Sequence, residues 1–168
     1  MNTPLNRTLL LAFVLFTEVL CAQSIDLNTV RSEFSSAVKS EEICAKNFKW
    51  LSKNANSVPT KGYEAVYKMI MAKHTSNPFK KMSHFKAGKR DLEDLIKENS
   101  TNTELRFIRF VIQAHIPKYL GYNAEMEADK DFLVQNLSKV TDKKTHKLLY
   151  TYLKGTNLFS IEELSLMD

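Results

Sequence analysis

The chain has 168 residues, of which 43% are hydrophobic and 26% are charged, and its formal net charge is +5. Four glycines and four prolines are too few for a collagen-like, proline-rich or turn-dense all-β protein, and the apolar content is too high for global disorder. The length fits one domain that buries its own hydrophobic core.

The first 22 residues are typical of a secretory signal peptide. Arg7 supplies the positive start, an apolar run follows, and Ala22 is a small residue at the predicted cleavage site. The run is shorter than the roughly 20 apolar residues that a bilayer span needs, and Glu18 follows it closely. We therefore expect a periplasmic or secreted protein whose mature part, residues 23–168, is a single helical domain without a transmembrane span.

Cleavage near Ala22 removes Cys21 and leaves Cys44 as the one cysteine of the mature chain, so no internal disulfide can form. Lipidation of Cys21 is the less favoured alternative, because a small residue usually precedes a lipidated cysteine and Leu20 is not small. Cys44 lies at helical spacing from Phe48, which favours a buried small side chain over a nucleophile. The domain is therefore predicted to hold together by packing alone.

Helical periodicity dominates the mature chain. Capping residues and helix-opening prolines mark the expected starts at Asp26, Ser40, Pro59, Asn77-Pro78, Thr101, Asp142 and Ser160, with a further helix over about 124–139. The first of these helices is expected to run to about Lys39. Gly88 is a candidate break in the helix that follows Pro78, and Pro117 either kinks or ends the helix before it. No segment shows strand alternation and no repeat has a fixed period. We expect an all-α fold, either a compact antiparallel bundle or a short solenoid-like stack of about seven helices.

The segment Glu104-Leu-Arg-Phe-Ile-Arg-Phe-Val-Ile-Gln113, followed by Ile116-Pro-Lys-Tyr-Leu-Gly-Tyr122 and Asp129-Lys-Asp-Phe-Leu133, carries a resemblance. It is similar to a group of small, exported, functionally uncharacterised helical proteins from Bacteroidetes-type bacteria. The similarity covers about residues 103–137 and its motifs are short. It implies an exported all-α protein and implies no activity.

Arg106, Arg109 and Gln113 form the most distinctive polar set, because spacings of three and four place them on one stripe of an otherwise apolar helix. One interpretation is a groove in which the arginines bind a carboxylate or phosphate. The favoured interpretation is an internal salt-bridge network that clamps two helices, since possible partners are close in sequence. These are Glu104, Asn123, Glu127, Asp129 and Asp131.

A basic segment precedes this helix. Between Glu64 and Asp91 there are seven basic residues and no acidic one. The surface candidates among them are Lys73, Lys80, Lys81, Lys86, Lys89 and Arg90. Phe79, Met82 and Phe85 alternate with the lysines, so the segment is amphipathic. It suits an anionic membrane surface, a glycan or another protein, although a solvated basic face over core aromatics is favoured. Nucleic acid is a poor partner for an exported chain.

Signals for metals, cofactors and catalysis are weak. The histidines, His74, His84, His115 and His146, are scattered, and no Gly-Xaa-Ser-Xaa-Gly elbow or phosphate loop is present. We therefore expect no cofactor and favour a non-enzymatic module that binds an unknown protein or peptide. The alternative is a small-ligand carrier or hydrolase with a pocket near Arg106, Arg109, His115, Tyr119 and Tyr122.

Overall fold

The computed structural model describes residues 25–168. The predicted signal peptide, residues 1–22, lies outside the described residues. Within the described range the chain is all-α, with nine α-helices, two short 3-10 helices and no strand, which confirms the predicted fold class. No helix of this range has the length and apolarity needed to cross a membrane.

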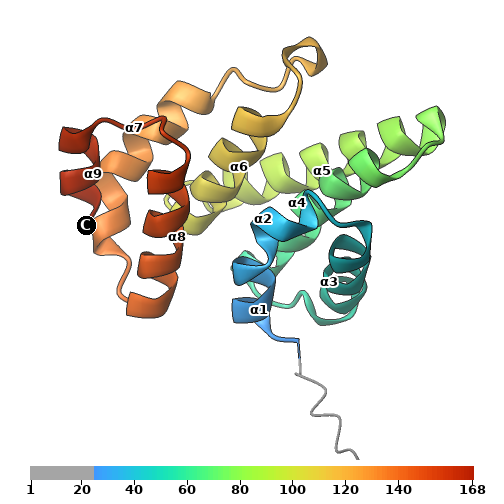
Figure 1. Cartoon of the computed structure of the whole chain (residues 1–168), viewed down its shortest axis with the longest axis horizontal. Coiled ribbons are helices and arrows are strands. Elements are labelled where there is room, and N and C mark those ends of the chain that lie inside the picture. The colour runs from blue at the N-terminus through green and yellow to red at the C-terminus, as the bar shows by residue number, and fades with distance from the viewer. Residues whose placement is uncertain (1–24) are drawn as a thin grey trace, which may run out of the picture.

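The first half of the described chain is built around a long antiparallel hairpin (Figure 1). The helices of this half are α1 (Leu27–Ser32), α2 (Phe34–Ala37), α3 (Glu41–Asn54), α4 (Val58–His74) and α5 (Pro78–Glu98). Helices α4 and α5 pack along their length, and α3 lies against α4. One end of the α4–α5 hairpin extends beyond the neighbouring helices, at the upper right of Figure 1.

The second half packs onto this hairpin through its first helix. Its elements are α6 (Thr103–His115), η1 (Lys118–Leu120), α7 (Met126–Asn136), η2 (Leu137–Lys139), α8 (Lys143–Gly155) and α9 (Ile161–Met167). Helix α6 contacts α4, α5 and α7, and it therefore joins the two halves. Nine of its thirteen residues are buried, as expected for an apolar helix that packs against several neighbours.

The helix starts follow the capping signals in the sequence. The side chains of Asp26, Ser40 and Asp142 accept hydrogen bonds from backbone N–H groups of the first turns of α1, α3 and α8. Ser160 and Glu163 form a reciprocal capping box at the start of α9. These predictions are confirmed because a cap depends only on residues a few positions apart.

Two expectations about helix continuity are wrong. Helix α5 runs through Gly88 without a break, and this glycine lies in close contact with α4. A Cβ atom there would lie 2.4 Å from the Ala65 carbonyl oxygen. The expected single helix over 26–39 is divided at Glu33, whose carboxylate accepts hydrogen bonds from Lys46 and Asn47 of α3.

Aromatic side chains fill the core between the halves. The Tyr152 ring of α8 lies 6.0 Å from the Phe34 ring of α2 and 5.5 Å from the Phe107 ring of α6. Cys44 is fully buried, and burial raises the pKa of its thiol to about 12. A thiol with this pKa is protonated at neutral pH, so its role is packing, as predicted.

Candidate functional site

Arg109 is the centre of a buried ion-pair network that joins three helices. Its Nε and Nη2 atoms donate to the two carboxylate oxygens of Asp129 on α7, at 2.6 and 2.8 Å. Its Nη1 atom donates to Glu93 on α5, at 2.8 Å. Both Arg109 and Asp129 are buried, so a bidentate pair of this kind fixes the position of α6 against α7.

Arg106 lies one turn earlier on α6 and completes the network. Its Nη1 atom lies 3.0 Å from the Asp129 carboxylate, and its guanidinium stacks 4.8 Å from the centre of the Phe132 ring. Burial raises the pKa of the Asp129 carboxyl, whereas the hydrogen bonds from Arg109 and the charge of Arg106 lower it, and the net direction is upward. Burial alone would lower the pKa of Arg109, but Asp129 and Glu93 raise it, so this guanidinium stays charged.

Tyr122 closes the network from the segment after η1. Its hydroxyl donates a hydrogen bond to Glu93, and Lys89 of α5 lies 4.6 Å above its ring. The chain can turn back at this point because Gly121 adopts a left-handed conformation, with φ of +60°. We refer to Arg106, Arg109, Asp129, Glu93 and Tyr122 as the arginine cluster. The guanidiniums have carboxylate partners inside the protein, which is the arrangement of a structural clamp.

The other two residues of the proposed pocket, His115 and Tyr119, form no hydrogen bond with the arginine cluster. Tyr119 is 86% exposed on η1, and His115 is an exposed residue whose Nδ1 atom lies 2.8 Å from the Val111 carbonyl oxygen of its own helix. Gln113 is buried, and neither of its amide atoms has a hydrogen-bond partner among residues 25–168. Neither the hollow beside Lys68 and Asp91 nor the hollow beside Arg31 and Glu104 is lined by any of these three side chains.

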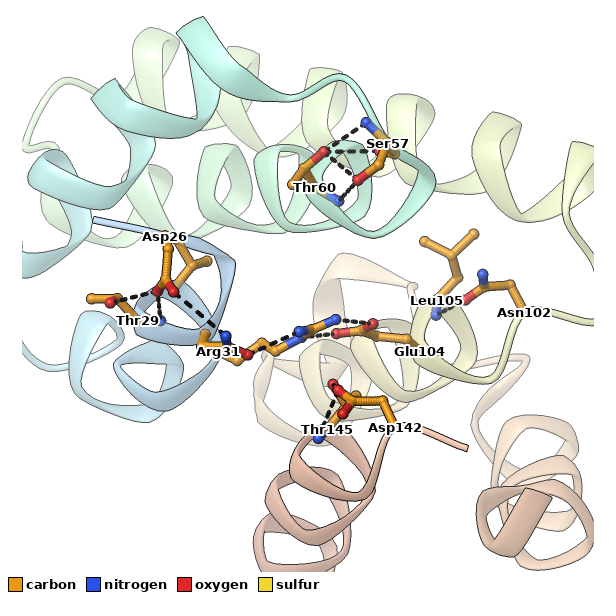
Figure 2. A network of polar contacts seen from close by, with 12 residues as sticks. Asp26, Thr29, Arg31, Ser57, Thr60, Asn102, Glu104, Leu105, Asp142 and Thr145 are labelled. Atoms are coloured by element: carbon orange, nitrogen blue, oxygen red, sulfur yellow. Dashed lines mark hydrogen bonds and ion pairs between the residues drawn. The ribbon is translucent and has the colours of Figure 1, made fainter. Parts of the chain in front are cut away.

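A second buried ion pair, which sequence reasoning missed, connects the two halves (Figure 2). Arg31 of α1 donates to both carboxylate oxygens of Glu104 on α6, at 2.6 and 2.7 Å, and the two side chains point toward each other. Asp142 and Thr145 of α8 lie beside them in Figure 2. The sequence placed Glu104 near Arg109, but the 73-residue separation of the actual pair left no local signal.

A hollow of about 380 Å³ lies next to this pair, between the first turns of α6 and α8. It is lined by both signs of charge, including Arg31, Lys139, Glu104 and Asp142. The Arg31 guanidinium is neutralised by Glu104, and the helix starts are capped by Asn102 and Asp142. The Arg31 guanidinium and the two helix starts are therefore already satisfied by the protein, and Lys139 donates a hydrogen bond to the Asn136 side chain.

Some cations of the basic segment have partners within the protein, and others have none among residues 25–168. Lys68 and Arg90 both pair with Asp91, and Lys89 lies over Tyr122. The lysines that form no salt bridge with any carboxylate of residues 25–168, and whose side chains are exposed, are Lys73, Lys80, Lys81 and Lys86. These lysines lie toward the projecting end of the α4–α5 hairpin (Figure 1).

This end also carries exposed apolar side chains. Phe79 is 85% exposed and Met82 is 43% exposed, whereas Phe85, three residues further along α5, is buried and packs against the Tyr122 ring. The apolar side of α5 is therefore covered by the rest of the protein at Phe85 but is exposed to solvent at Phe79 and Met82. We call the surface formed by Lys73, Phe79, Lys80, Lys81 and Met82 the basic tip.

Among residues 25–168 there is no group of three or more His, Cys, Asp or Glu side chains that could hold a metal ion. No protein-family model matches the chain, and neither a curated protein nor a solved structure shows significant similarity to it.

Proposed function

We propose that the protein is a non-enzymatic binding module, exported to the periplasm or cell exterior, that contacts an anionic partner through the basic tip. The observation that carries this proposal is the combination of Phe79, at 85% exposure, with three exposed lysines of the tip, Lys73, Lys80 and Lys81, that form no salt bridge within residues 25–168. Exposed cations attract an anionic surface, and an exposed aromatic side chain gains free energy when it is covered.

The arginine cluster supports the same function because both of its guanidiniums are paired with carboxylates, although Arg106 Nε is buried without a hydrogen-bond partner among the described residues. An anion that entered it would have to displace Asp129 from a bidentate pair at 2.6 and 2.8 Å. Breaking a buried pair costs about 3–5 kcal/mol, which a single new contact does not recover. The cluster therefore holds α5, α6 and α7 together and fixes the position of the hairpin that carries the basic tip.

The proposal can be tested with a charge-reversed tip and a matched control. Lys80→Glu/Lys81→Glu is expected to abolish salt-sensitive binding to three defined polyanions: heparin, polyglutamate and vesicles that contain phosphatidylglycerol. The control, Lys147→Glu/Lys154→Glu, makes the same change in net charge on exposed lysines of α8 and should keep binding. Equal loss in both variants, or no binding to any of the three polyanions, would refute a specific role for the tip.

A further inference from the structure

We infer that the partner of the basic tip is the surface of an anionic lipid bilayer, into which Phe79 and Met82 insert while the surrounding lysines contact lipid headgroups. This inference rests on the proposed function and adds the class of partner. It is carried by the order of the side chains along the hairpin, by the shape of its end and by the charge of the residues around it.

The order of side chains matches the polarity profile of a membrane surface. Phe79 and Met82 occupy the first turns of α5, and Lys80 and Lys81 lie between them, while Lys73 is in the last turn of α4. Apolar groups of an interfacial segment lie at the boundary of headgroups and acyl chains, and lysine side chains reach back to the phosphates. No acidic residue occurs between Glu64 and Asp91, so no carboxylate in this part of the sequence opposes the approach.

The shape of the tip favours a lipid surface over a folded protein. The hairpin end extends away from the body (Figure 1), and two hollows of the described residues lie elsewhere, one beside Lys68 and Asp91 and the other beside Arg31 and Glu104. A stable protein interface needs about 800 Å² of complementary surface from each partner. A fluid bilayer needs no shape complementarity, so a narrow convex end with two apolar side chains suits it better.

The first turn of α5 is held in a helical conformation by local contacts, so the tip does not need to fold when it meets a membrane. The Asn77 side chain accepts hydrogen bonds from the N–H groups of Phe79 and Lys80, and Pro78 occupies the first position of α5. Further along, the close approach of Gly88 to Ala65 holds the two helices of the hairpin together. Little ordering entropy is therefore lost when the tip meets a surface.

The first experiment measures co-sedimentation of residues 23–168 with vesicles of phosphatidylcholine and phosphatidylglycerol in equal parts, against phosphatidylcholine alone. Binding is expected only to the anionic vesicles and should weaken as salt is raised, because salt screens the headgroup charge. Lys80→Glu/Lys81→Glu should weaken binding by about 30-fold or more, since each basic residue near an anionic surface contributes about fivefold. Lys147→Glu/Lys154→Glu should change it much less.

The second variant pair separates insertion from charge attraction. Phe79→Gln keeps every charge and should weaken vesicle binding by about tenfold, because the phenyl ring no longer enters the apolar layer. The matched control is Ile161→Gln, which removes an 83%-exposed apolar side chain at the start of α9, far from the tip. Equal binding by Phe79→Gln and the parent chain would overturn the insertion proposal.

A fluorescence readout reports insertion directly. In a Phe79→Trp/Trp50→Phe chain the one tryptophan lies at the tip, and its emission should shift to the blue when anionic vesicles are added. Binding without a shift would overturn insertion. Tip-dependent binding to polyglutamate together with absent vesicle binding would overturn the lipid inference and keep the proposed function, with an acidic protein segment as the partner.

Discussion

The arginine cluster and the basic tip both contain cations on helices. The cations of the cluster are paired with carboxylates, whereas those of the tip are exposed to solvent. Arg109 is buried and meets two carboxylates, from Asp129 and Glu93. Lys80 and Lys81 are exposed and pair with no carboxylate of the described chain. Charge density alone therefore does not identify a binding surface: what matters is whether the neighbouring elements supply the counter-charge.

The largest expected effect tests the structural side of this comparison. Arg109→Met should lower the free energy of unfolding by about 3–5 kcal/mol, because Asp129 is left buried without its bidentate partner. The free energy of unfolding is measured by urea denaturation followed by circular dichroism. Arg90→Met is the control, and its loss should stay below about 1 kcal/mol, since Arg90 is exposed. Equal small losses would show that the cluster is not a clamp and would favour ligand binding there.

The hairpin that carries the tip can be disturbed from within at Gly88. Gly88→Ala should lower the free energy of unfolding by about 1–3 kcal/mol, because the new Cβ would meet backbone atoms of Ala65 and Met69 that cannot move independently. Gly62→Ala is the comparison, since its closest neighbour is a terminal methyl group of the Leu105 side chain and not a backbone atom. Thermal unfolding ranks the two variants. A larger loss for Gly62→Ala would contradict the proposed role of Gly88.

The pH dependence of stability tests the local hydrogen bonds of Asp142, in contrast to the ion pairs between helices. Hydrogen bonds from Thr145 and from the backbone of Lys144 hold the pKa of Asp142 below its ordinary value of 3.8. Because the folded-state pKa is lower than the unfolded one, this stabilisation is complete above about pH 4 and is lost as the pH falls through the folded-state value. The melting temperature of Asp142→Asn should therefore decrease less between pH 6 and pH 3 than that of the parent chain. An equal decrease would mean that Asp142 contributes no proton linkage.

The smallest effect on stability is expected at the tip. Lys80→Glu/Lys81→Glu should change the free energy of unfolding by less than about 0.5 kcal/mol, because both side chains are exposed and acidic residues are tolerated in the first turn of a helix. The measurement is urea denaturation of the same preparation used for binding. A large loss would show that the lysines support the fold, which would bring the tip closer to the arginine cluster in character.

Local signals predicted most of the fold. Asp26, Ser40, Asp142 and Ser160 cap the helices that begin after them, because each cap is made by residues within one turn. Gly88 was misinterpreted as a break for the opposite reason. Glycine generally destabilises a helix, so the sequence alone favoured a break at this position. The packing of α4 against α5 shows that the absence of a side chain at Gly88 permits close contact between the two helices.

The candidate site was predicted in part. The pairing of Arg106 and Arg109 with Asp129 was foreseeable, because the three residues lie on consecutive helices joined by a short connection. Glu93 was not foreseen, since α5 precedes α6 and faces it only in the folded chain. The position of Tyr119 in solvent and of Tyr122 in the core also depended on the turn at Gly121.

The sequence by itself determined the helical class, the helix starts and the uneven distribution of charge, because these depend on spacing, capping and composition. The tertiary structure alone decided the ion pairs between helices that had no local signal in the sequence, and with them the cations that remain without a carboxylate partner in residues 25–168. Hydrogen bonds from Arg31 to Glu104 and from Arg109 to Glu93 join residues of different helices, and their formation requires the packed core. Coulomb interactions depend on distance and burial rather than on order along the chain, and the fold alone sets both.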